Sequence, residues 1–196
     1  MNQNPCILCL DIAMRNIGAA ILQWNTVALD FVSGSVLVTD AATKEDRKEH
    51  TKASLYVKDS AYLYEQLHKL VAGKEIGLIA GELPLGAQSA SAAMCLGVCW
   101  GLMGSLIASF DNIPYVWVTP TEVKKAMCSK KTATKEEMMN CAGFLYPDSL
   151  VPFMRHGKLL NRYEHVADAI GVSLAIRQTT EFKHYVALCE AISKKT

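Results

Sequence analysis

The stretch Cys6-Ile-Leu-Cys-Leu-Asp-Ile12 is an apolar run that contains a single carboxylate, Asp11, and it decides how the fold is interpreted. Short continuous apolar runs bounded by turn signals are typical of buried strands. A turn, Met14-Arg-Asn-Ile-Gly18, follows the run, and residues 19–24 and 28–38 form two further strand-like segments. Three such segments in succession predict a three-stranded meander.

Helical and strand-like segments alternate after the meander. Residues 39–51 are polar and charged, and apolar residues then recur at helical spacing from Leu55 to Val71. A meander followed by this alternation predicts an α/β fold, a mixed sheet with helices on both faces. We find no repeat or linker, so we expect one domain over residues 1–196. The expected further strands are 76–80 and 113–118, the expected helices are 87–110, 120–127, 135–145, 161–177 and 181–192, and residues 147–158 are expected to be irregular.

The segment 87–110 is apolar on most of its sides. It is long enough to pass a hydropathy test for a membrane span, but Gly97, Gly101 and Gly104 break it and a polar Gln88-Ser89 pair begins it. We therefore expect a buried helix packed between the sheet and another element, and no membrane partner. Its small residues allow close helix approach and make it a candidate contact between two copies of the chain.

The composition narrows the class of protein. Hydrophobic residues make up 51% and charged residues 20% of the chain, which excludes a disordered or low-complexity protein. The formal net charge is only +1. A protein of this charge does not hold nucleic acid through bulk charge, so any polyanionic partner must meet a local basic patch.

The cysteines indicate a reducing compartment. There are seven of them, an odd number, scattered along a chain too large to need disulfides for stability. Cys6 and Cys9 form a C-x-x-C pattern, but residues three apart on a strand point to opposite faces, so we expect two buried thiols and no metal site. No basic segment precedes the first apolar run, which argues against a secretory signal. We expect a cytoplasmic protein of a bacterium or a phage-infected cell.

Acidic and imidazole side chains occur where the pattern predicts burial. Asp11 lies in the first strand, Glu82 ends the fourth, and His165 and Asp168 are three apart on a helix and share one face. Buried carboxylates are costly unless a positive charge lies between them. Two strand carboxylates and one helical pair can meet at one point, and an oxygen-rich set with one imidazole suits Mg²⁺ or Mn²⁺. Each of these residues alone also has an ordinary structural interpretation. The occurrence of all four together favours a metal site.

The order of these features resembles that of RuvC-type Holliday-junction resolvases, which belong to the RNase H-like nuclease superfamily. The resemblance runs from about residue 6 to 176 and includes Asp11 with Gly18, a Glu at the end of the fourth strand and a small-residue helix. Its most specific parts are the motifs Thr119-Pro-Thr-Glu-Val-Lys-Lys-Ala-Met127, Ala133-Thr-Lys-Glu-Glu-Met138 and His165-Val-Ala-Asp-Ala-Ile170.

The resemblance implies an RNase H-like sheet of five strands, the first three antiparallel, with a divalent-metal site at its acidic centre. The matched positions are Asp11, Glu82, His165 and Asp168. It further implies two Mg²⁺ or Mn²⁺ ions per site, with Asp11 as a bridging ligand, Glu82 and Asp168 as flanking ligands and His165 as a ligand or proton carrier. Many members have Asp at the position of His165, and many have an aromatic residue at the position of Leu85.

A basic segment offers contacts for DNA phosphates. Five lysines lie within twelve residues that contain no acid, around a loop rich in Ser and Thr. Arg15, just after Asp11, adds a candidate phosphate contact. Without the resemblance the pattern favours a solvated surface loop, and the resemblance favours DNA contact. The candidate DNA-binding residues are Arg15, Lys124, Lys125, Lys130, Lys131 and Lys135.

The sequence thus predicts a metal-dependent, structure-selective endonuclease that resolves four-way DNA junctions by phosphodiester hydrolysis. We expect a homodimer, because a junction needs two symmetric cuts. A nuclease of the same superfamily acting on other branched DNA or on RNA–DNA hybrids is an alternative that the sequence does not separate from it. A catalytically silent DNA-binding relative is a second alternative, against which the presence of all four metal-site positions argues.

Overall fold

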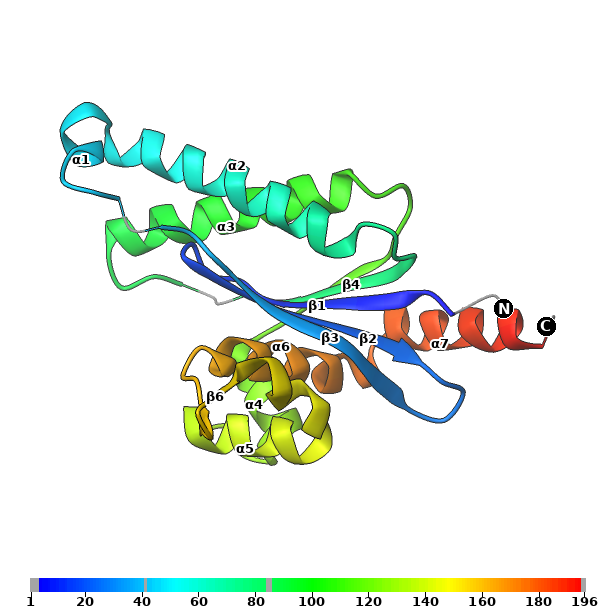
Figure 1. Cartoon of the computed structure of the whole chain (residues 1–196). Coiled ribbons are helices and arrows are strands. Elements are labelled where there is room, and N and C mark those ends of the chain that lie inside the picture. The colour runs from blue at the N-terminus through cyan, green and yellow to red at the C-terminus, as the bar shows by residue number, and fades with distance from the viewer. Residues whose placement is uncertain (1–3, 41, 84–85, 195–196) are drawn as a thin grey trace.

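The computed structural model describes residues 4–40, 42–83 and 86–194. Its centre is a five-stranded sheet in the order β3-β2-β1-β4-β5 (Figure 1). The pairs β1–β2 and β2–β3 are antiparallel, whereas β1–β4 and β4–β5 are parallel. The predicted mixed sheet with an antiparallel meander is confirmed. The strands are β1 (Cys6–Asp11), β2 (Asn16–Trp24), β3 (Leu29–Val38), β4 (Ile76–Glu82) and β5 (Tyr115–Val118).

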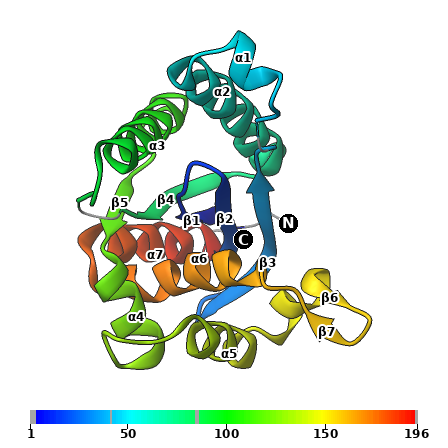
Figure 2. The same ribbon diagram turned by 90° about the vertical axis from the view of Figure 1, so that its left-hand side faces the viewer.

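Helices cover both faces of the sheet, as predicted (Figures 1 and 2). The long helices α2 and α3 pack against each other over one face, with the short α1 beyond the start of α2, and α4 to α7 lie on the opposite face. The helices are α1 (Asp46–Glu49), α2 (Lys52–Val71), α3 (Ala90–Ala108), α4 (Pro120–Cys128), α5 (Lys135–Leu145), α6 (Tyr163–Ala175) and α7 (Thr180–Ser193).

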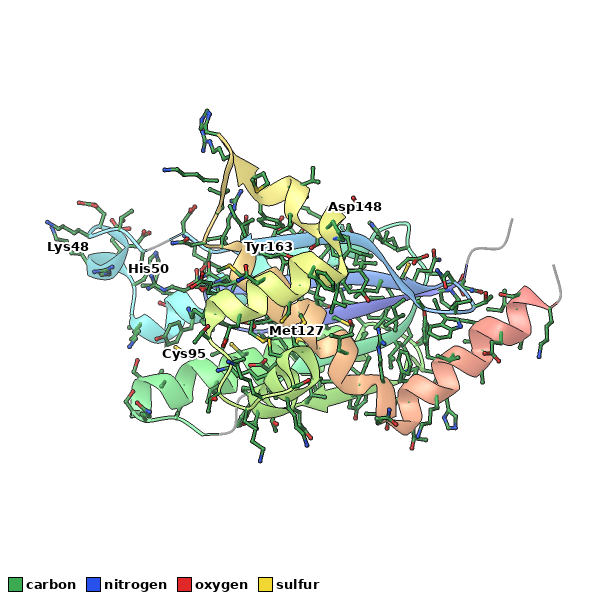
Figure 3. The ribbon with its side chains drawn as sticks, turned by 90° about the horizontal axis from the view of Figure 1, so that it is seen from below. Lys48, His50, Cys95, Met127, Asp148 and Tyr163 are labelled. Carbon is green, nitrogen blue, oxygen red and sulfur yellow. The ribbon has the colours of Figure 1, made fainter. Side chains whose placement is uncertain are left out.

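The alternation of side chains along β1 divides the core into two layers. Ile7 and Cys9 belong to the cluster formed with α4 to α7, and Cys6 and Leu8 belong to the cluster formed with α2 and α3. Both sulfurs of the C-x-x-C pattern are therefore buried on opposite sides, as expected, and all seven cysteines are free thiols. Figure 3 views the α4 to α6 side, where Tyr163 is fully buried.

Three local expectations need correction or detail. The polar stretch 39–51 contains α1, and the stretch expected to be irregular contains a 3₁₀ helix, Pro147–Phe153, followed by the short hairpin of β6 (Met154–Arg155) and β7 (Lys158–Leu159). The hydroxyl group of Ser149 in this 3₁₀ helix lies 2.6 Å from that of Tyr163, the first residue of α6. A second 3₁₀ turn, Ile176–Gln178, separates α6 from α7.

The expectation that the apolar helix α3 is enclosed on both sides is wrong. Its buried side chains, Cys99, Leu102, Met103 and Leu106, all face α2 and the sheet. The opposite side is exposed, and Met94 and Trp100 each keep 46% of their surface accessible. Within the described residues α3 is also the one helix long and apolar enough to cross a membrane by length and composition.

Candidate active site

Two carboxylates lie side by side where neighbouring parallel strands end. Asp11 is the last residue of β1 and Glu82 is the last residue of β4, and the two are direct partners in the register of the parallel pair. On its other side Asp11 pairs with Gly18 of β2. Ligand sites in α/β sheets form beyond the carboxyl ends of strands, and this is such an end.

Helix α6 brings the second pair of predicted residues to the same place. His165 and Asp168 are one turn apart on α6, which crosses the sheet over β1 and β2. Gly18 makes this crossing possible, because a Cβ built on it would lie 1.9 Å from the backbone oxygen of His165. A side chain on β2 at this point would push the helix away from the sheet.

A hydrogen bond links the helix to the strand. The Nδ1 atom of His165 lies 3.0 Å from Oδ2 of Asp11, and the carboxylate can only accept, so the imidazole donates. Both side chains are mostly enclosed, with 19% and 17% of their surfaces exposed. The bond to Asp11 raises the pKa of His165 above its ordinary value, against the opposing effect of burial. The imidazolium form is thereby stabilised beside Asp11.

Burial and neighbouring negative charges destabilise the ionised forms of the other two carboxyl groups, those of Glu82 and Asp168. Burial, followed by the charges of Asp11 and Asp168, raises the pKa of Glu82 to about 8. Burial, followed by the charge of Asp11, raises the pKa of Asp168 to about 7. Lys124 opposes both shifts, so its ammonium group acts on the same centre. The acids are close enough to repel one another, which is the environment that a bound cation relieves.

The fit of a divalent metal can be judged from these residues. Within the described ranges, no three His, Cys, Asp or Glu side chains are arranged to hold one ion. The carboxylate of Asp11 is instead engaged by His165. The donor set itself, three partly buried carboxylates and an imidazole, with raised pKa values at Glu82 and Asp168, suits Mg²⁺ or Mn²⁺. Asp11, Glu82 and Asp168 are the side chains that would hold the metal, with His165 beside them.

The raised pKa of Glu82 gives a prediction about stability. A folded-state carboxyl pKa of about 8 means that the folded protein retains a proton that the unfolded chain releases above about pH 4. Stability of the metal-free protein therefore falls as pH rises from about 4 to 8. We expect Glu82→Gln to raise the melting temperature of the metal-free protein by roughly 5 °C at pH 8.5 and to leave it unchanged at pH 4.

Calorimetry in a chelating buffer measures this difference. Glu75→Gln is the matched control, since the Glu75 side chain is not among the groups at the acidic centre, and it should shift neither melting temperature. Added Mg²⁺ should stabilise wild type at pH 8.5 more than Glu82→Gln, because the variant lacks one negative ligand. Equal melting temperatures for wild type and Glu82→Gln at both pH values would contradict the proposed repulsion.

The predicted lysines have different surroundings. Lys124 is half-buried on α4 and acts on the acidic centre, whereas Lys125 and Lys131 are exposed and take part in no ion pair among the described residues. Lys130 forms an ion pair with Glu137, and Lys135 forms one with Glu164. Two of the five lysines are thus neutralised by acids of the chain itself.

Capping boxes fix the segment 124–135 that carries these lysines, called the lysine loop below. Thr119 and Glu122 cap the start of α4, and Thr134 and Glu137 cap the start of α5, each through reciprocal hydrogen bonds between side chain and backbone. The loop between them begins at Ser129, whose backbone is left-handed with φ 59°. Both motifs are readable in the sequence as Thr-x-x-Glu, so the helix starts are where the pattern indicates.

Three functional contributions are not evident from the sequence. These are the close approach at Gly18, the position of Lys124 near the acids, and Glu164, which pairs with Lys135 and lies 3.8 Å from Nε2 of His165. Glu164 alone resembles any solvated helix charge, and only its place next to His165 is a signal. Leu85, the position at which many members of the resembled family have an aromatic residue, lies outside the described residues.

Comparisons with known proteins support the fold. The sequence matches no protein-family model and no curated protein. Among solved structures, RuvC of T. thermophilus in complex with a Holliday junction substrate is similar with a TM-score of 0.65 and 13% identity, over 94% of this chain and 98% of that one. The yeast mitochondrial Holliday junction resolvase Ydc2 is similar with a TM-score of 0.60 and 14% identity, over 97% and 86% of the two chains. The chain therefore has the RNase H-like fold of the RuvC-type resolvases, as its motifs predicted.

Proposed function

We propose that the chain is a divalent-metal-dependent endonuclease, a single nuclease domain over residues 1–196, that resolves four-way DNA junctions. The observation that carries the proposal is the group of partly buried, mutually repelling carboxyl groups, Asp11, Glu82 and Asp168, at the end of an RNase H-like sheet. The fold is shared with a RuvC whose structure holds a Holliday junction. Nothing in the site favours a catalytically silent relative.

The chemistry of such a site is phosphodiester hydrolysis. A bound pair of Mg²⁺ or Mn²⁺ ions would supply an activated water and stabilise the charge on the leaving oxygen. Asp11, central in the register between Gly18 and Glu82, is the ligand best placed to serve both ions. His165 holds a proton at Nδ1 toward Asp11, and this hydrogen bond would compete with a metal for the Asp11 carboxylate. Lys124 adds positive charge for the scissile phosphate.

A direct cleavage assay tests the proposal. Purified protein is incubated with labelled four-way junction, flap and linear duplex DNA, and with an RNA–DNA hybrid, in Mg²⁺, in Mn²⁺ and in a chelator. We expect paired nicks in the junction, present with either metal and absent with the chelator. Preferential cutting of the hybrid or of the flap would favour the alternative branched-DNA or RNA–DNA nuclease, and no cleavage of any substrate would overturn the proposal.

The lysine loop is proposed to bind the DNA backbone, and its ion pairs make the prediction specific. Replacing Lys125 and Lys131 by Ala removes two unpaired ammonium groups, so the slope of log affinity against log salt should flatten by roughly 1.8 for duplex DNA. Replacing Lys130 alone should flatten it much less, because Glu137 already neutralises that charge. Fluorescence anisotropy of a labelled junction between 50 and 200 mM salt measures the slopes of wild type and of the two variants. Three identical slopes would show that the lysine loop is solvated surface that does not contact DNA.

A homodimer follows from the requirement for two symmetric cuts, and the exposed side of α3 is its proposed interface. Met94, Gly97, Trp100 and Gly101 lie along one stripe of this side, at spacings of three and four residues. A Cβ added at either glycine would meet nothing within 4 Å in the isolated chain, so the space above them is free for a second helix.

The interface can be tested through Gly101. We expect Gly101→Trp to convert a dimer into a monomer while leaving the fold intact, because the new side chain fills space that the partner helix needs. Light scattering coupled to size-exclusion chromatography measures the mass, and circular dichroism checks the fold. Lys183→Trp, which places the same side chain at an exposed residue of α7 on the other face of the sheet, should leave the mass unchanged. A monomeric wild type at concentrations up to about 100 µM would refute the interface.

We also propose a reducing compartment, the cytoplasm of a bacterium or a phage-infected cell. All seven cysteines are free, and the sulfurs of Cys128 and Cys141 lie 3.3 Å apart as thiols. In an oxidising compartment such neighbours tend to become a disulfide.

A further inference from the structure

A cavity lined by basic side chains lies between the β1–β2 turn, α1 and the start of α2, outside the active site described above. Its volume is about 350 Å³. Arg15 comes from the turn, Arg47 and His50 from α1 and the residue that follows it, and Lys52 from the first turn of α2. Three separate segments of the chain therefore place cationic or ionisable groups around one hollow.

The charges of this cavity are available to a partner. Arg15, Arg47, His50 and Lys52 are exposed, and none of them is in an ion pair within the part of the chain that the structure describes. The lysine loop differs, since Lys130 and Lys135 are held by acids. Asp59 also lines the hollow and the charge of Arg15 acts on its carboxylate, so Arg47 and Lys52 are the cations left for a partner. Cations that face one hollow repel each other, and an anion between them relieves that repulsion.

One of these cations is held in position. The ammonium group of Lys52 lies 5.6 Å from the centre of the Tyr56 ring and donates a hydrogen bond to the Ser91 hydroxyl at the start of α3. The Tyr56 hydroxyl in turn accepts from the Sγ atom of Cys95, 3.2 Å away. Lys52 is thus pre-organised between α2 and α3, which lowers the entropy lost when it contacts a ligand.

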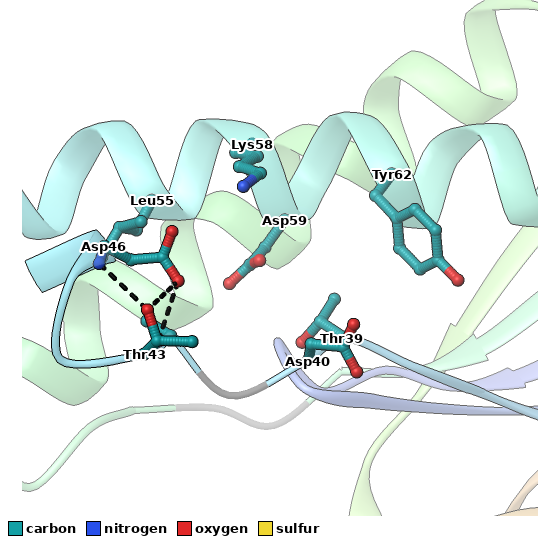
Figure 4. Close-up of a pocket in the computed structure, with 9 residues that line it drawn as sticks. Thr39, Asp40, Thr43, Asp46, Leu55, Lys58, Asp59 and Tyr62 are labelled. Carbon is teal, nitrogen blue, oxygen red and sulfur yellow. Dashed lines mark hydrogen bonds between the residues drawn. The ribbon is translucent and has the colours of Figure 1, made fainter. Parts of the chain in front are cut away.

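A second hollow, of about 280 Å³, adjoins the first and has the opposite character. Asp40, Asp46 and Asp59 line it, with Lys58 above them (Figure 4). The Asp46 carboxylate accepts hydrogen bonds from the backbone N–H and the hydroxyl of Thr43, both at 2.8 Å. Asp59 lines both hollows, so the sign of the charge changes across it. An anion is therefore attracted to the hollow that Arg15 lines and repelled from the one that Asp40 and Asp46 line.

From this geometry we infer that the basic cavity binds the phosphodiester backbone of a DNA arm, at a second contact separate from the lysine loop. The inference rests on the proposed function and adds to it how the substrate is held. Arginine and lysine side chains on three segments suit neighbouring phosphates, and the half-buried Tyr56 offers a hydroxyl beside them.

The position of the cavity fits this role. Arg15 lies four residues after Asp11, in the turn that joins β1 to β2 at the active-site end of the sheet. Figure 2 looks onto this end: α1 and the start of α2 lie above the sheet, and α4, α5 and α6 lie below it. Figure 3 shows His50 and Lys48 at the projecting α1 end. A backbone bound in the cavity is therefore on the opposite side of the acidic centre from the lysine loop.

Salt-dependent binding tests the inference. We expect the double variant Arg47→Ala/Lys52→Ala to weaken junction binding by about tenfold at 100 mM salt and to flatten the salt slope by roughly 1.8. The matched control, Lys183→Ala/Lys194→Ala, removes the same net charge from two exposed lysines of α7 and its C-terminal cap, neither of them in an ion pair among the described residues, and should leave the slope unchanged. A wild type that binds no junction would refute the proposed function itself. A wild type that binds, with a double variant equal to the control, would overturn only this inference.

Ethylation interference locates the contact on the DNA. Wild type should show two separate groups of phosphates whose ethylation blocks binding. The group that is lost in Arg47→Ala/Lys52→Ala should differ from the group lost in Lys125→Ala/Lys131→Ala. Loss of one and the same group in both variants would contradict a second contact. Titration with inorganic phosphate is the remaining measurement. If phosphate binds in the cavity and the double variant binds the junction as wild type does, the cavity is a site for a free anion and the DNA assignment is overturned.

Discussion

Replacement of Asp11 by Asn is expected to lower the rate of junction cleavage by more than about a hundredfold while junction affinity changes less than about threefold. Asp11 is central in the register between Gly18 and Glu82 and accepts the hydrogen bond of His165. An amide is a weaker metal ligand than a carboxylate and carries no charge, and even changes in the groups that support a ligand cost about ten- to a hundredfold. The lysine loop and the basic cavity, which we propose to bind DNA, are untouched.

Two measurements separate chemistry from binding. Single-turnover cleavage in Mg²⁺ gives the rate, and anisotropy in Ca²⁺ or a chelator gives the affinity. Asp111→Asn, a change of the same type at an exposed residue after α3, serves as the control and should cleave like wild type. Cleavage by Asp11→Asn at the wild-type rate would show that the metal ligands lie elsewhere.

Gly18→Ala is expected to destabilise the protein by about 3 kcal/mol and to abolish cleavage, although the change adds one methyl group. The added Cβ would lie 1.9 Å from the backbone oxygen and 2.8 Å from the Cβ of His165. Backbone atoms of a helix in contact with the sheet do not rotate away, so α6 itself must move. His165 and Asp168 move with it. For a chain of this length the melting temperature should fall by roughly 6 to 12 °C.

Chemical denaturation measures the loss, with Gly104→Ala on α3 as the control. A Cβ at Gly104 meets nothing within 4 Å, and alanine is the better helix former by about 1 kcal/mol, so this variant should be slightly more stable than wild type. The same substitution is therefore expected to have opposite signs at the two glycines, because packing opposes it at Gly18 and helix propensity favours it at Gly104. If Gly18→Ala is as stable as wild type, α6 does not press on the sheet as described.

The elements of the fold were predictable from the sequence wherever the pattern is local. The run at Cys6–Asp11 forms β1, and the helix expected at residues 135–145 has those bounds, because Thr134 and Glu137 mark its start. The role of α3 was not predictable in the same way. Apolar residues around a helix indicate that it avoids water, but they do not indicate whether its own chain or another molecule covers it.

The candidate site was predictable as a set of residues and not as a geometry. Asp11, Glu82, His165 and Asp168 stand out because charges interrupt apolar segments, and the structure places them at one end of the sheet. The pairing of Lys135 with Glu164 spans 29 residues, so no local pattern contains it. The contact of Gly18 with α6 is likewise a product of tertiary packing.

The wide separation of the site residues along the chain has a consequence for biosynthesis. β1 and β4 are made early, but α6 begins at Tyr163 and supplies both His165 and Asp168, so most of the chain must leave the ribosome before the site exists. Contacts of such long range also form late in folding, because closing the intervening loops costs entropy. A nascent or truncated chain that ends before α6 therefore lacks His165 and Asp168, and the candidate site is completed only by roughly the last sixth of the chain.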